Sequence, residues 1–401
     1  MVRTGVCAPT GFRAAGVAAG IRGDADDRPD VALVVSDRPC SAAGVFTRNL
    51  VKAAPVVLSQ LTLRRRGPIR AIVVNSGNAN ACTGPQGVRD ALSMATAAAD
   101  SCGADPSEVL VCSTGVIGRP MPMDRVLEGI RAAAQALDSG GGGPAARAIM
   151  TTDTVTKTAT ASARIAGTVC TVGGMAKGAG MIHPDMATLL GFLTTDATVE
   201  RDALHAVLAE ACSRTFNCLS VDGDTSTNDS LLLLANGAAR TAPVTSGTEG
   251  CRALLGAVEE VCLSLVEQLA ADAEGATRSI LVSVLGAVDD HQARAAARTI
   301  VQSQLVKSAV HGADPNWGRV VAALGRSGAS FTLERCHVAI GGAEVFADGE
   351  PLPVDLGALR AALRRPRIDI ELELGAGTGS GRAWGCDLSP EYVHINADYT
   401  T

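Results

Sequence analysis

Residues 177–197 read Lys-Gly-Ala-Gly-Met-Ile-His-Pro-Asp-Met-Ala-Thr-Leu-Leu-Gly-Phe-Leu-Thr-Thr-Asp-Ala. The stretch begins with a glycine-rich segment, which can adopt backbone angles closed to other residues. His183-Pro184-Asp185 then indicates a turn, because proline fixes its own φ and keeps the preceding residue out of the helical region. The apolar run from Thr188 to Thr195 predicts a buried strand. Thr188 therefore lies where a bent loop enters a strand, directly after the small residue Ala187.

This setting suits a threonine that attacks its own backbone. The Thr188 hydroxyl reaches the Ala187 carbonyl through a five-membered ring, and a held, bent peptide lowers the cost of that attack. Hydrolysis of the resulting ester would free Thr188 as a new N-terminus, whose α-amino group has a pKa of about 7.7–8.0. Such an amine can act as general base for the threonine's own hydroxyl. The same residues also fit a plain turn into a core strand with Thr188 merely packed, and this stretch alone leaves both interpretations open.

Composition limits the classes of protein to consider. The chain has 401 residues, enough for a large core and for two or three domains. Aromatic residues make up only 2%, so the core must be built from Val, Leu, Ile and Ala. The net charge is −6 and the longest basic run is Arg64-Arg65-Arg66, which argues against nucleic acid as a partner. We expect a cytoplasmic protein, because no apolar run reaches the roughly 18 residues of a membrane span and the N-terminus is a poor signal peptide.

The residues that could bind a metal do not form a convincing site. The 12 cysteines are scattered through apolar stretches without a C-x-x-C pair, which indicates free buried thiols. Asp222-Gly-Asp224 is faintly similar to a calcium loop, but the closing glutamate and the full ligand spacing are missing. We therefore expect no metal. His311, beside a glycine, is a candidate base, although a lone histidine in such a place is more often structural.

Hydrophobic patterning predicts alternating strands and helices. Two polar loops follow predicted strands. The Asn/Gly-rich loop 75–84 fits either a long turn or an active-site wall. Ser113-Thr114-Gly115 places a hydroxyl beside a backbone N–H, as an oxyanion hole requires, although an ordinary turn has the same pattern. We expect strands at 31–35, 43–46, 54–58, 70–74, 108–112, 158–172, 279–288 and 392–401, helices at 87–99, 123–137, 200–217, 250–270 and 289–301, and an exposed glycine linker at 139–144.

Several segments, spread over nearly the whole chain, resemble the ornithine acetyltransferases, also called bifunctional glutamate N-acetyltransferases. The stretch Lys-Gly-x-Gly-Met-Ile-x-Pro-x-Met-Ala-Thr resembles their self-cleavage signature, and this favours the nucleophile interpretation of Thr188. Arg119 occupies a position where many relatives have another residue. The other matching segments are Gly11-Phe-Arg-Ala-Ala-Gly, the Asn75 loop, Ser113-Thr-Gly-Val-Ile-Gly, Met150-Thr-Thr-Asp-Thr, Asp222-Gly-Asp-Thr-Ser-Thr-Asn-Asp, His311-Gly-Ala-Asp-Pro-Asn-Trp-Gly-Arg and Ile395-Asn-Ala-Asp-Tyr.

The resemblance implies a mixed α/β (α+β) fold of helices sandwiching β-sheets, of the self-cleaving N-terminal-nucleophile type. Cleavage between Ala187 and Thr188 would give an α chain, 1–187, and a β chain, 188–401, which stay associated as an α2β2 assembly. The implied reaction moves an acetyl group from N2-acetyl-L-ornithine to L-glutamate by a ping-pong route through acyl-Thr188, in cyclic arginine biosynthesis. No cofactor is implied. Acetyl-CoA enters as a further donor, because some members of the family accept it.

The resemblance also implies roles for individual residues. Thr188 is the nucleophile, and Thr114 and Gly115 hold the oxyanion. Lys177 can neutralise a carboxylate, and Glu274 can pair with the side-chain ammonium of ornithine. The implied partners are small molecules, with neither nucleic acid nor membrane. The implied substrate-binding residues are Thr154, Lys177, Thr188, Glu274, Asn396 and Thr401.

Three other functions fit the same sequence. In a self-cleaving aminopeptidase or amidase, water replaces glutamate as the acceptor, and acetate or an amino acid is released without glutamate. A paralogue in specialised metabolism would use a different acceptor. A non-enzymatic interaction protein sharing the fold would remain uncleaved and form no acyl-Thr188.

Overall fold

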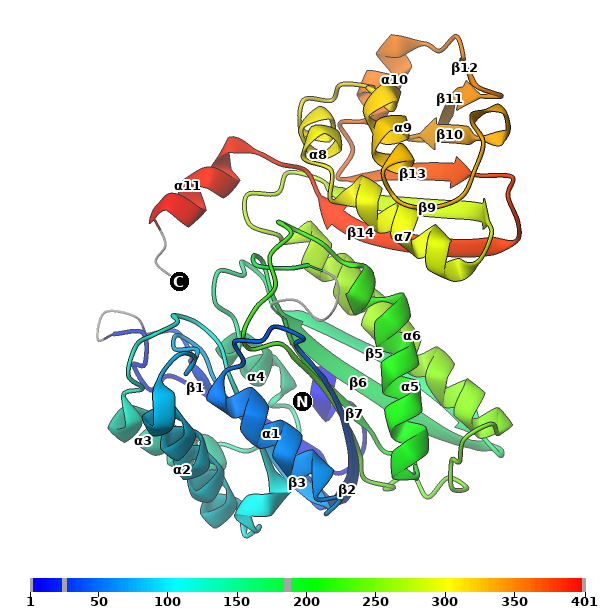
Figure 1. Ribbon diagram of the computed structural model, residues 1–401. Coiled ribbons are helices and arrows are strands. Elements are labelled where there is room, and N and C mark those ends of the chain that lie inside the picture. Colours follow the sequence, from blue (N-terminus) through cyan, green and yellow to red (C-terminus); the bar gives the residue numbers. More distant parts are fainter. Residues whose placement is uncertain (1–2, 24–26, 184–188, 399–401) are drawn as a thin grey trace.

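The computed structural model describes residues 3–23, 27–183 and 189–398, which form two β-sheets with helices packed on them (Figure 1). The larger sheet has the strand order β4-β3-β2-β8-β7-β6-β5, and β1 pairs with β2. Its strands are β1 (Phe12–Val17), β2 (Val31–Phe46), β3 (Ile69–Asn75), β4 (Val109–Ser113), β5 (Lys157–Ile165), β6 (Thr168–Lys177), β7 (Leu190–Thr195) and β8 (Ser230–Ala235).

Helices cover both faces of the larger sheet, and this explains why its central strands are apolar throughout. Successive side chains of a strand point to opposite faces. In β8, Leu231 and Leu233 belong to the core cluster that contains side chains of α5 and α6, whereas Leu232 and Leu234 belong to the cluster that contains side chains of α4. At the other end of the sheet, α2 and α3 pack on β1 to β4. The helices of this part are α1 (Ala54–Arg64), α2 (Gly84–Cys102), α3 (Met123–Gln135), α4 (Gly142–Ala148), α5 (Arg201–Arg214) and α6 (Glu249–Ala271).

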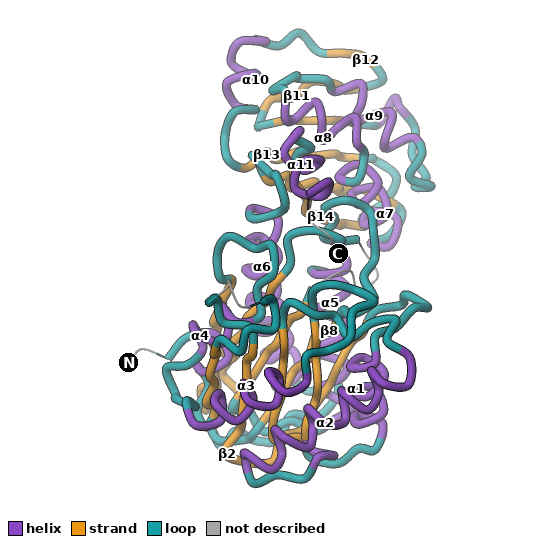
Figure 2. Tube along the Cα trace, turned by 90° about the vertical axis from the view of Figure 1, so that its left-hand side faces the viewer, coloured by secondary structure: helices purple, strands orange, loops and turns teal. Residues whose placement is uncertain are grey.

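The smaller sheet lies beyond the end of the larger one, as the perpendicular view shows (Figure 2), and has the order β12-β11-β10-β13-β9-β14. In β9, Ile280, Val282 and Val284 are buried, whereas Leu285 is exposed. This strand therefore has one covered and one open face. The remaining elements are β9 (Ser279–Ala287), α7 (Asp290–Val301), α8 (Gln304–His311), α9 (Trp317–Gly325), β10 (His337–Ile340), β11 (Ala343–Ala347), β12 (Glu350–Pro351), α10 (Leu356–Ala362), β13 (Arg367–Glu373), β14 (Gly379–Cys386) and α11 (Pro390–Asp398).

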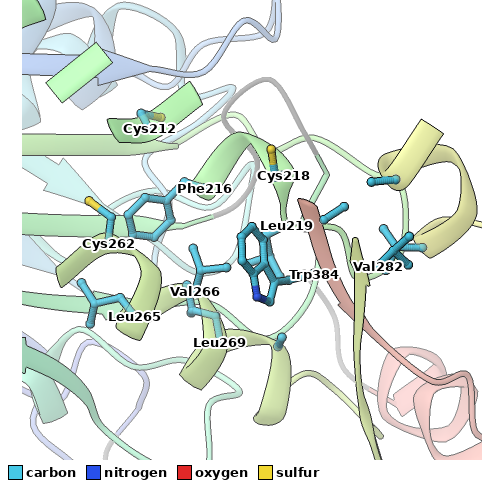
Figure 3. Close-up of a cluster of buried hydrophobic side chains, with 14 of the residues drawn as sticks. Cys212, Phe216, Cys218, Leu219, Cys262, Leu265, Val266, Leu269, Val282 and Trp384 are labelled. Atoms are coloured by element: carbon cyan, nitrogen blue, oxygen red, sulfur yellow. The ribbon is translucent and has the colours of Figure 1, made fainter. Parts of the chain in front are cut away.

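A single apolar cluster joins the two sheets. Trp384 of β14 is only 5% exposed and packs among Leu219, Val266 and Leu269 (Figure 3). Leu219 also forms a β-bridge with Trp384. Because α6 contacts strands of both sheets, the two halves share one core.

The mixed α/β fold with helix-covered sheets is confirmed, but four predicted elements are wrong. Residues 54–58 form the start of α1 rather than a strand, because Pro55 stands in the first helical turn, where its missing N–H costs nothing. Residues 392–398 are helical in α11 rather than part of a strand. The Ser389 hydroxyl accepts from the Glu391 N–H (3.2 Å) and caps this helix, and Pro390 is its first residue.

The other two corrections concern glycines. The strand expected at 158–172 is the hairpin β5–β6, whose turn at Ala166 and Gly167 has φ of 47° and 85°. The glycine stretch at 139–144 is not an exposed linker. A Cβ on Gly141 would lie 1.8 Å from the Ala14 carbonyl oxygen, and one on Gly142 would lie 2.2 Å from that of Thr4. These glycines let the start of α4 pack directly on the N-terminal backbone.

The cysteines behave as predicted, since all 12 are free thiols and most are buried. Burial raises the pKa of Cys112 to about 12, which keeps this thiol unreactive. Within the three described ranges, no helix is both long and apolar enough to cross a membrane.

Candidate active site

The turn after β4 presents two hydrogen-bond donors. Gly115 has a φ of 130°, and a Cβ on it would lie 2.3 Å from the carbonyl carbon of Gly77, so only glycine fits. The Thr114 N–H is used by the Asn75 carbonyl (3.0 Å), whereas no acceptor for the Gly115 N–H is found in the described part of the chain. The Thr114 hydroxyl and the Gly115 N–H therefore remain as the donors of this turn.

The Asn/Gly-rich loop supports that turn. The Asn75 side-chain amide donates to the Asn78 carbonyl (2.8 Å), and the Asn78 amide donates to the carbonyls of Arg119 and Pro120 (3.2 and 3.1 Å). These amides tie the loop to the segment that follows Thr114 and Gly115. The loop 75–84 is therefore a long turn that does not line the cavity itself. It holds the segment that carries the two donors.

Lys177 orients the Thr114 hydroxyl. The Lys177 ammonium donates to Thr114 Oγ1 (3.2 Å), and an ammonium group has no acceptor of its own. The Thr114 oxygen must therefore accept, which leaves the hydroxyl proton to be donated elsewhere. Burial lowers the pKa of Lys177, and the nearby Asp153 carboxylate opposes that shift.

Asp153 holds the end of β6 on which Lys177 stands. Its Oδ1 accepts from the Gly178 N–H and from the Lys157 ammonium, both at 2.7 Å. Lys157 also donates to Asp272 Oδ2 (2.5 Å), so a fully buried lysine bridges two carboxylates. Burial by itself would raise the pKa of Asp153. The positive charges of Lys177 and Lys157 have the larger effect and keep the Asp153 pKa below its usual range.

Two carboxylates of the loop 220–230 hold the backbone on either side of residues 184–188. Before this segment, Asp222 accepts from the N–H groups of Met181 (2.5 Å) and Ile182 (3.0 Å). After it, Asp229 Oδ1 accepts from the Leu189 N–H (2.9 Å). Asp229 is 1% exposed, and its Oδ2 has no partner within the described residues. Burial raises the pKa of Asp229 well above its usual range.

Glu274 reaches the same place from the turn between α6 and β9. Its N–H donates to the Ala179 carbonyl (2.9 Å), and its Oε2 accepts from the Asn396 side-chain amide of α11 (2.9 Å). The Tyr392 hydroxyl of α11 donates to Asp222 Oδ2 (3.3 Å). Figure 1 shows α11 set apart from the smaller sheet, and these two contacts place it over the site.

These elements surround one cavity of about 120 Å³, whose wall contains one ammonium group, that of Lys177, and three carboxylates. The carboxylates are those of Asp222, Asp224 and Glu274. Such a cavity fits a small zwitterionic molecule, with the two donors of the β4 turn in its wall. Its other lining residues include Thr114, Gly115, Thr151, Thr152, Lys177, Tyr392 and Asn396.

The comparison with known sequences decides the family, because the ArgJ family profile matches residues 13–401. The chain belongs to the ArgJ family. The Arginine biosynthesis bifunctional protein ArgJ of Symbiobacterium thermophilum is 52% identical over 397 residues, covering 99% of this chain and 98% of that protein. The protein of the same name from Thermosynechococcus vestitus is 47% identical, with 99% and 98% covered. The resemblance found in the sequence is therefore confirmed.

A solved ArgJ structure agrees with the fold. The crystal structure of Arginine biosynthesis bifunctional protein argJ from Bacillus halodurans matches with a TM-score of 0.50 at 40% identity. The match covers 51% of this chain and 97% of that chain.

The ArgJ resemblance implies a set of site residues. Most of those that the structure describes lie together. Thr114, Gly115, Lys177, Glu274 and Asn396 all line the cavity. Thr154 does not line it. The Thr154 hydroxyl and N–H both donate to Asp272, and its neighbours Thr151 and Thr152 form the wall instead. Its assignment as a substrate-binding residue stays a prediction. Ala187, Thr188 and Thr401 lie outside the described residues.

The structure gives His311 a structural place. His311 Nδ1 lies 2.8 Å from Asp387 Oδ2, and Asp387 also accepts from the N–H and hydroxyl of Thr277. His311 does not line the cavity, and nothing in its contacts indicates a catalytic base. In the described part of the chain, no cluster of three or more His, Cys, Asp or Glu side chains could hold a metal.

Sequence reasoning missed the roles of Asp229 and Tyr392. The segment from Asp222 to Asp229 matches the family, but no feature of the sequence marked Asp229 as an individual site residue. No local pattern marks Tyr392, because its contact with Asp222 joins residues 170 positions apart.

Proposed function

We propose that this ArgJ-family chain transfers an acetyl group from N2-acetyl-L-ornithine to L-glutamate through an acyl-Thr188 intermediate, in arginine biosynthesis. One observation carries the proposal: Thr114, whose hydroxyl accepts from Lys177, and Gly115 line the same cavity as Glu274. Lys177 is paired with Leu190 across β6 and β7, so the covalent chain places Thr188 two residues before that pair.

In the first half-reaction, Thr188 Oγ attacks the acetyl carbonyl and its proton passes to the Thr188 α-amine. The Thr114 hydroxyl and the Gly115 N–H stabilise the oxyanion, and losing one such donor typically lowers kcat by about 10²–10³. The bond from the acetyl carbon to the ornithine nitrogen then breaks, and ornithine leaves with the proton. Glu274 pairs with the ornithine side-chain ammonium.

In the second half-reaction, the glutamate α-amine attacks the acetyl–Thr188 ester. A carbon–nitrogen bond forms, the bond to Oγ breaks, and the proton from the attacking amine returns to Oγ. The residues proposed to hold substrate are Thr154, Lys177, Thr188, Glu274, Asn396 and Thr401. Acetyl-CoA is proposed as a second donor for the first half-reaction, a proposal that the word bifunctional in the relatives' names supports. No cofactor is needed by this route.

The proposal includes self-cleavage into chains 1–187 and 188–401 that stay together as an α2β2 assembly in the cytoplasm. The sheet order supports their association, because β7 and β8 would belong to the second chain yet lie between β6 and β2 of the first. The length of the B. halodurans chain supports cleavage, since 97% of it covers only 51% of this chain.

The test is an intact mass of the purified protein beside that of Thr188→Ala, followed by an acetylornithine-plus-glutamate assay. We expect two fragments and acetyl transfer from the wild type, and one full-length, inactive chain from the variant. Thr160→Ala, a change at an exposed threonine of β5, should cleave normally. A full-length mass for the wild type would overturn the N-terminal-nucleophile mechanism, and acetate release without glutamate would indicate an amidase.

A further inference from the structure

Three charged side chains that do not line the cavity form an ion triad. Lys157 is fully buried, and its ammonium donates to Asp153 Oδ1 (2.7 Å) and to Asp272 Oδ2 (2.5 Å). It also donates to the Val155 carbonyl (3.3 Å), so all three of its donors are used. Burying charges costs desolvation free energy that their attraction barely offsets, so such a triad contributes little stability by itself. What the triad holds in place therefore matters more than the free energy of its charges.

The Asp153 arm of the triad holds the side of the cavity on which Lys177 stands. Asp153 Oδ1 also accepts from the Gly178 N–H (2.7 Å), directly after Lys177. Asp153 Oδ2 accepts from the Thr151 N–H (3.0 Å), and both Thr151 and Lys177 line the cavity. Because the Lys177 ammonium donates to the Thr114 hydroxyl, this arm reaches the proposed oxyanion donors through one further contact.

The Asp272 arm holds the turn that carries Glu274. Asp272 is the last residue that caps α6, two positions before Glu274. Its carboxylate accepts from the N–H groups of Thr154 (3.0 Å) and Val155 (3.3 Å) and from the Thr154 hydroxyl. The Glu274 N–H donates to the Ala179 carbonyl (2.9 Å). The turn is thus fixed at its start by the triad and at Glu274 by the segment that follows β6.

The two arms connect the two places where the proposed donor is recognised. Thr114 and Gly115 receive the oxygen of its acetyl group, and Glu274 pairs with its side-chain ammonium. The number of methylene groups between these places distinguishes ornithine from longer and shorter diamino acids. A site that holds both places at a fixed span accepts one length, and one methylene group is typically worth about 10–200-fold in kcat/KM.

We propose that Lys157 is a positioning residue that determines specificity: through Asp153 and Asp272 it fixes the span between the oxyanion donors and Glu274, and this span selects the length of the donor's side chain. The inference rests on the proposed function. N2-acetyl-L-lysine carries the same ammonium group one methylene further out, so the span and not the charge excludes it.

The test compares acetylornithine with N2-acetyl-L-lysine as donors, with glutamate as acceptor, in the cleaved, full-length protein. Both donors leave the same acetyl–Thr188, so any difference between them arises before the acyl-enzyme has formed. We expect the wild type to prefer acetylornithine by about 10–200-fold in kcat/KM. In Lys157→Met this preference should fall about tenfold or more, because the charge-assisted contacts with both carboxylates are lost.

Asp272→Asn is the second variant, because removing Lys157 leaves buried carboxylates without their cation and is strongly destabilising. The substitution keeps the shape of the side chain and leaves Lys157 paired with Asp153. It weakens only the arm that leads to Glu274, so the preference for acetylornithine should fall in the same direction. If Lys157→Met does not fold, Asp272→Asn decides the test.

Asp196→Asn is the matched control. Asp196 is also a buried carboxylate that accepts from two N–H groups, those of Thr10 (2.9 Å) and Thr171 (2.8 Å), and it does not line the cavity. Its substitution should lower the melting temperature, because the bonds to these N–H groups weaken, and should keep the donor preference of the wild type.

The outcomes separate the two proposals. A wild type that forms no acyl-enzyme would overturn the proposed function itself. A wild type that transfers acetyl groups from both donors equally well would overturn only the role of Lys157. The same holds if the folded triad variants keep the donor preference of Asp196→Asn, or if kcat/KM falls by one factor for both donors, because a loss of folded protein affects both alike.

Discussion

Gly180 shows how a single missing side chain shapes the site. A Cβ at this position would lie 2.3 Å from Glu274 Oε2. The atom in the way belongs to the end of a flexible side chain, so a methyl group would displace the Glu274 carboxylate rather than the backbone. Gly180 therefore leaves room for the group that we propose to bind the ornithine ammonium.

We predict that Gly180→Ala raises the KM for acetylornithine by about tenfold while the protein stays folded, because the charge-assisted contact is worth about 1.5–3 kcal/mol. Steady-state kinetics with acetylornithine as the varied substrate measure the change, and a thermal melt checks the fold. Gly256→Ala in α6 is the control, since nothing lies within 4 Å of its Cβ position. An unchanged KM in Gly180→Ala would show that Glu274 does not bind the ammonium.

The loop 220–230 is the element that defines the proposed cleavage region. Asp222 holds the N–H groups of Met181 and Ile182, and Asp229 holds that of Leu189. One loop therefore fixes both ends of the segment that contains the proposed scissile bond. Asp229 differs from Asp222 in lying fully inside the core, with one oxygen that has no partner in the described chain.

We predict that the stability of the protein carries a pH dependence from Asp229 that Asp229→Asn removes. The folded pKa of Asp229 is raised by burial, so its stabilising contribution is complete below the unfolded pKa of about 3.9. That contribution is lost as the pH rises through the higher folded pKa. The melting temperature of Asp229→Asn relative to the wild type should therefore increase as the pH rises from about 4.

Asp105→Asn provides a comparison of opposite sign. Hydrogen bonds from Ser107 lower the pKa of Asp105, so its contribution is present at neutral pH and is lost on acidification. A melting-temperature difference between Asp229→Asn and the wild type that stays constant from pH 4 to pH 8 would contradict a raised Asp229 pKa.

At the scale of the whole molecule, the proposed cut falls inside one sheet rather than between domains. β7 pairs with β6 on one side and with β8 on the other, and β8 pairs with β2. The Trp384 cluster then joins the larger sheet to the smaller one (Figure 3). Two chains cut before Thr188 would thus share a continuous hydrogen-bonded ladder and a core.

We predict that the cleaved chains co-elute in size-exclusion chromatography and separate only in denaturant, with one cooperative unfolding transition. The physical reason is that removing the second chain would expose both edges of the β7–β8 pair and the apolar side chains of β8. Mass spectrometry of the eluted peak checks that both chains are present. Elution of either chain alone in native buffer would contradict the shared sheet.

The sequence by itself determined the family, the alternating strands, and five of the residues that line the cavity: Thr114, Gly115, Lys177, Glu274 and Asn396. These features are local: strand periodicity, the Thr114-Gly115 pair and the motif before Thr188 can be read from neighbouring residues. It failed at 54–58 and 392–398, where β-branched or alternating residues indicated strands. Proline near each helix start, and the Ser389 cap at the second, favour helices.

Only the tertiary structure decided how distant residues combine. Lys177 meets Thr114 across 63 positions, and Asn396 meets Glu274 across 122. The roles of Gly180 and Asp229 depend on such approaches. The conformational preference of a residue depends on its neighbours in the sequence. It carries no information about which distant residue will contact it, because that is set by how the two sheets and their helices pack.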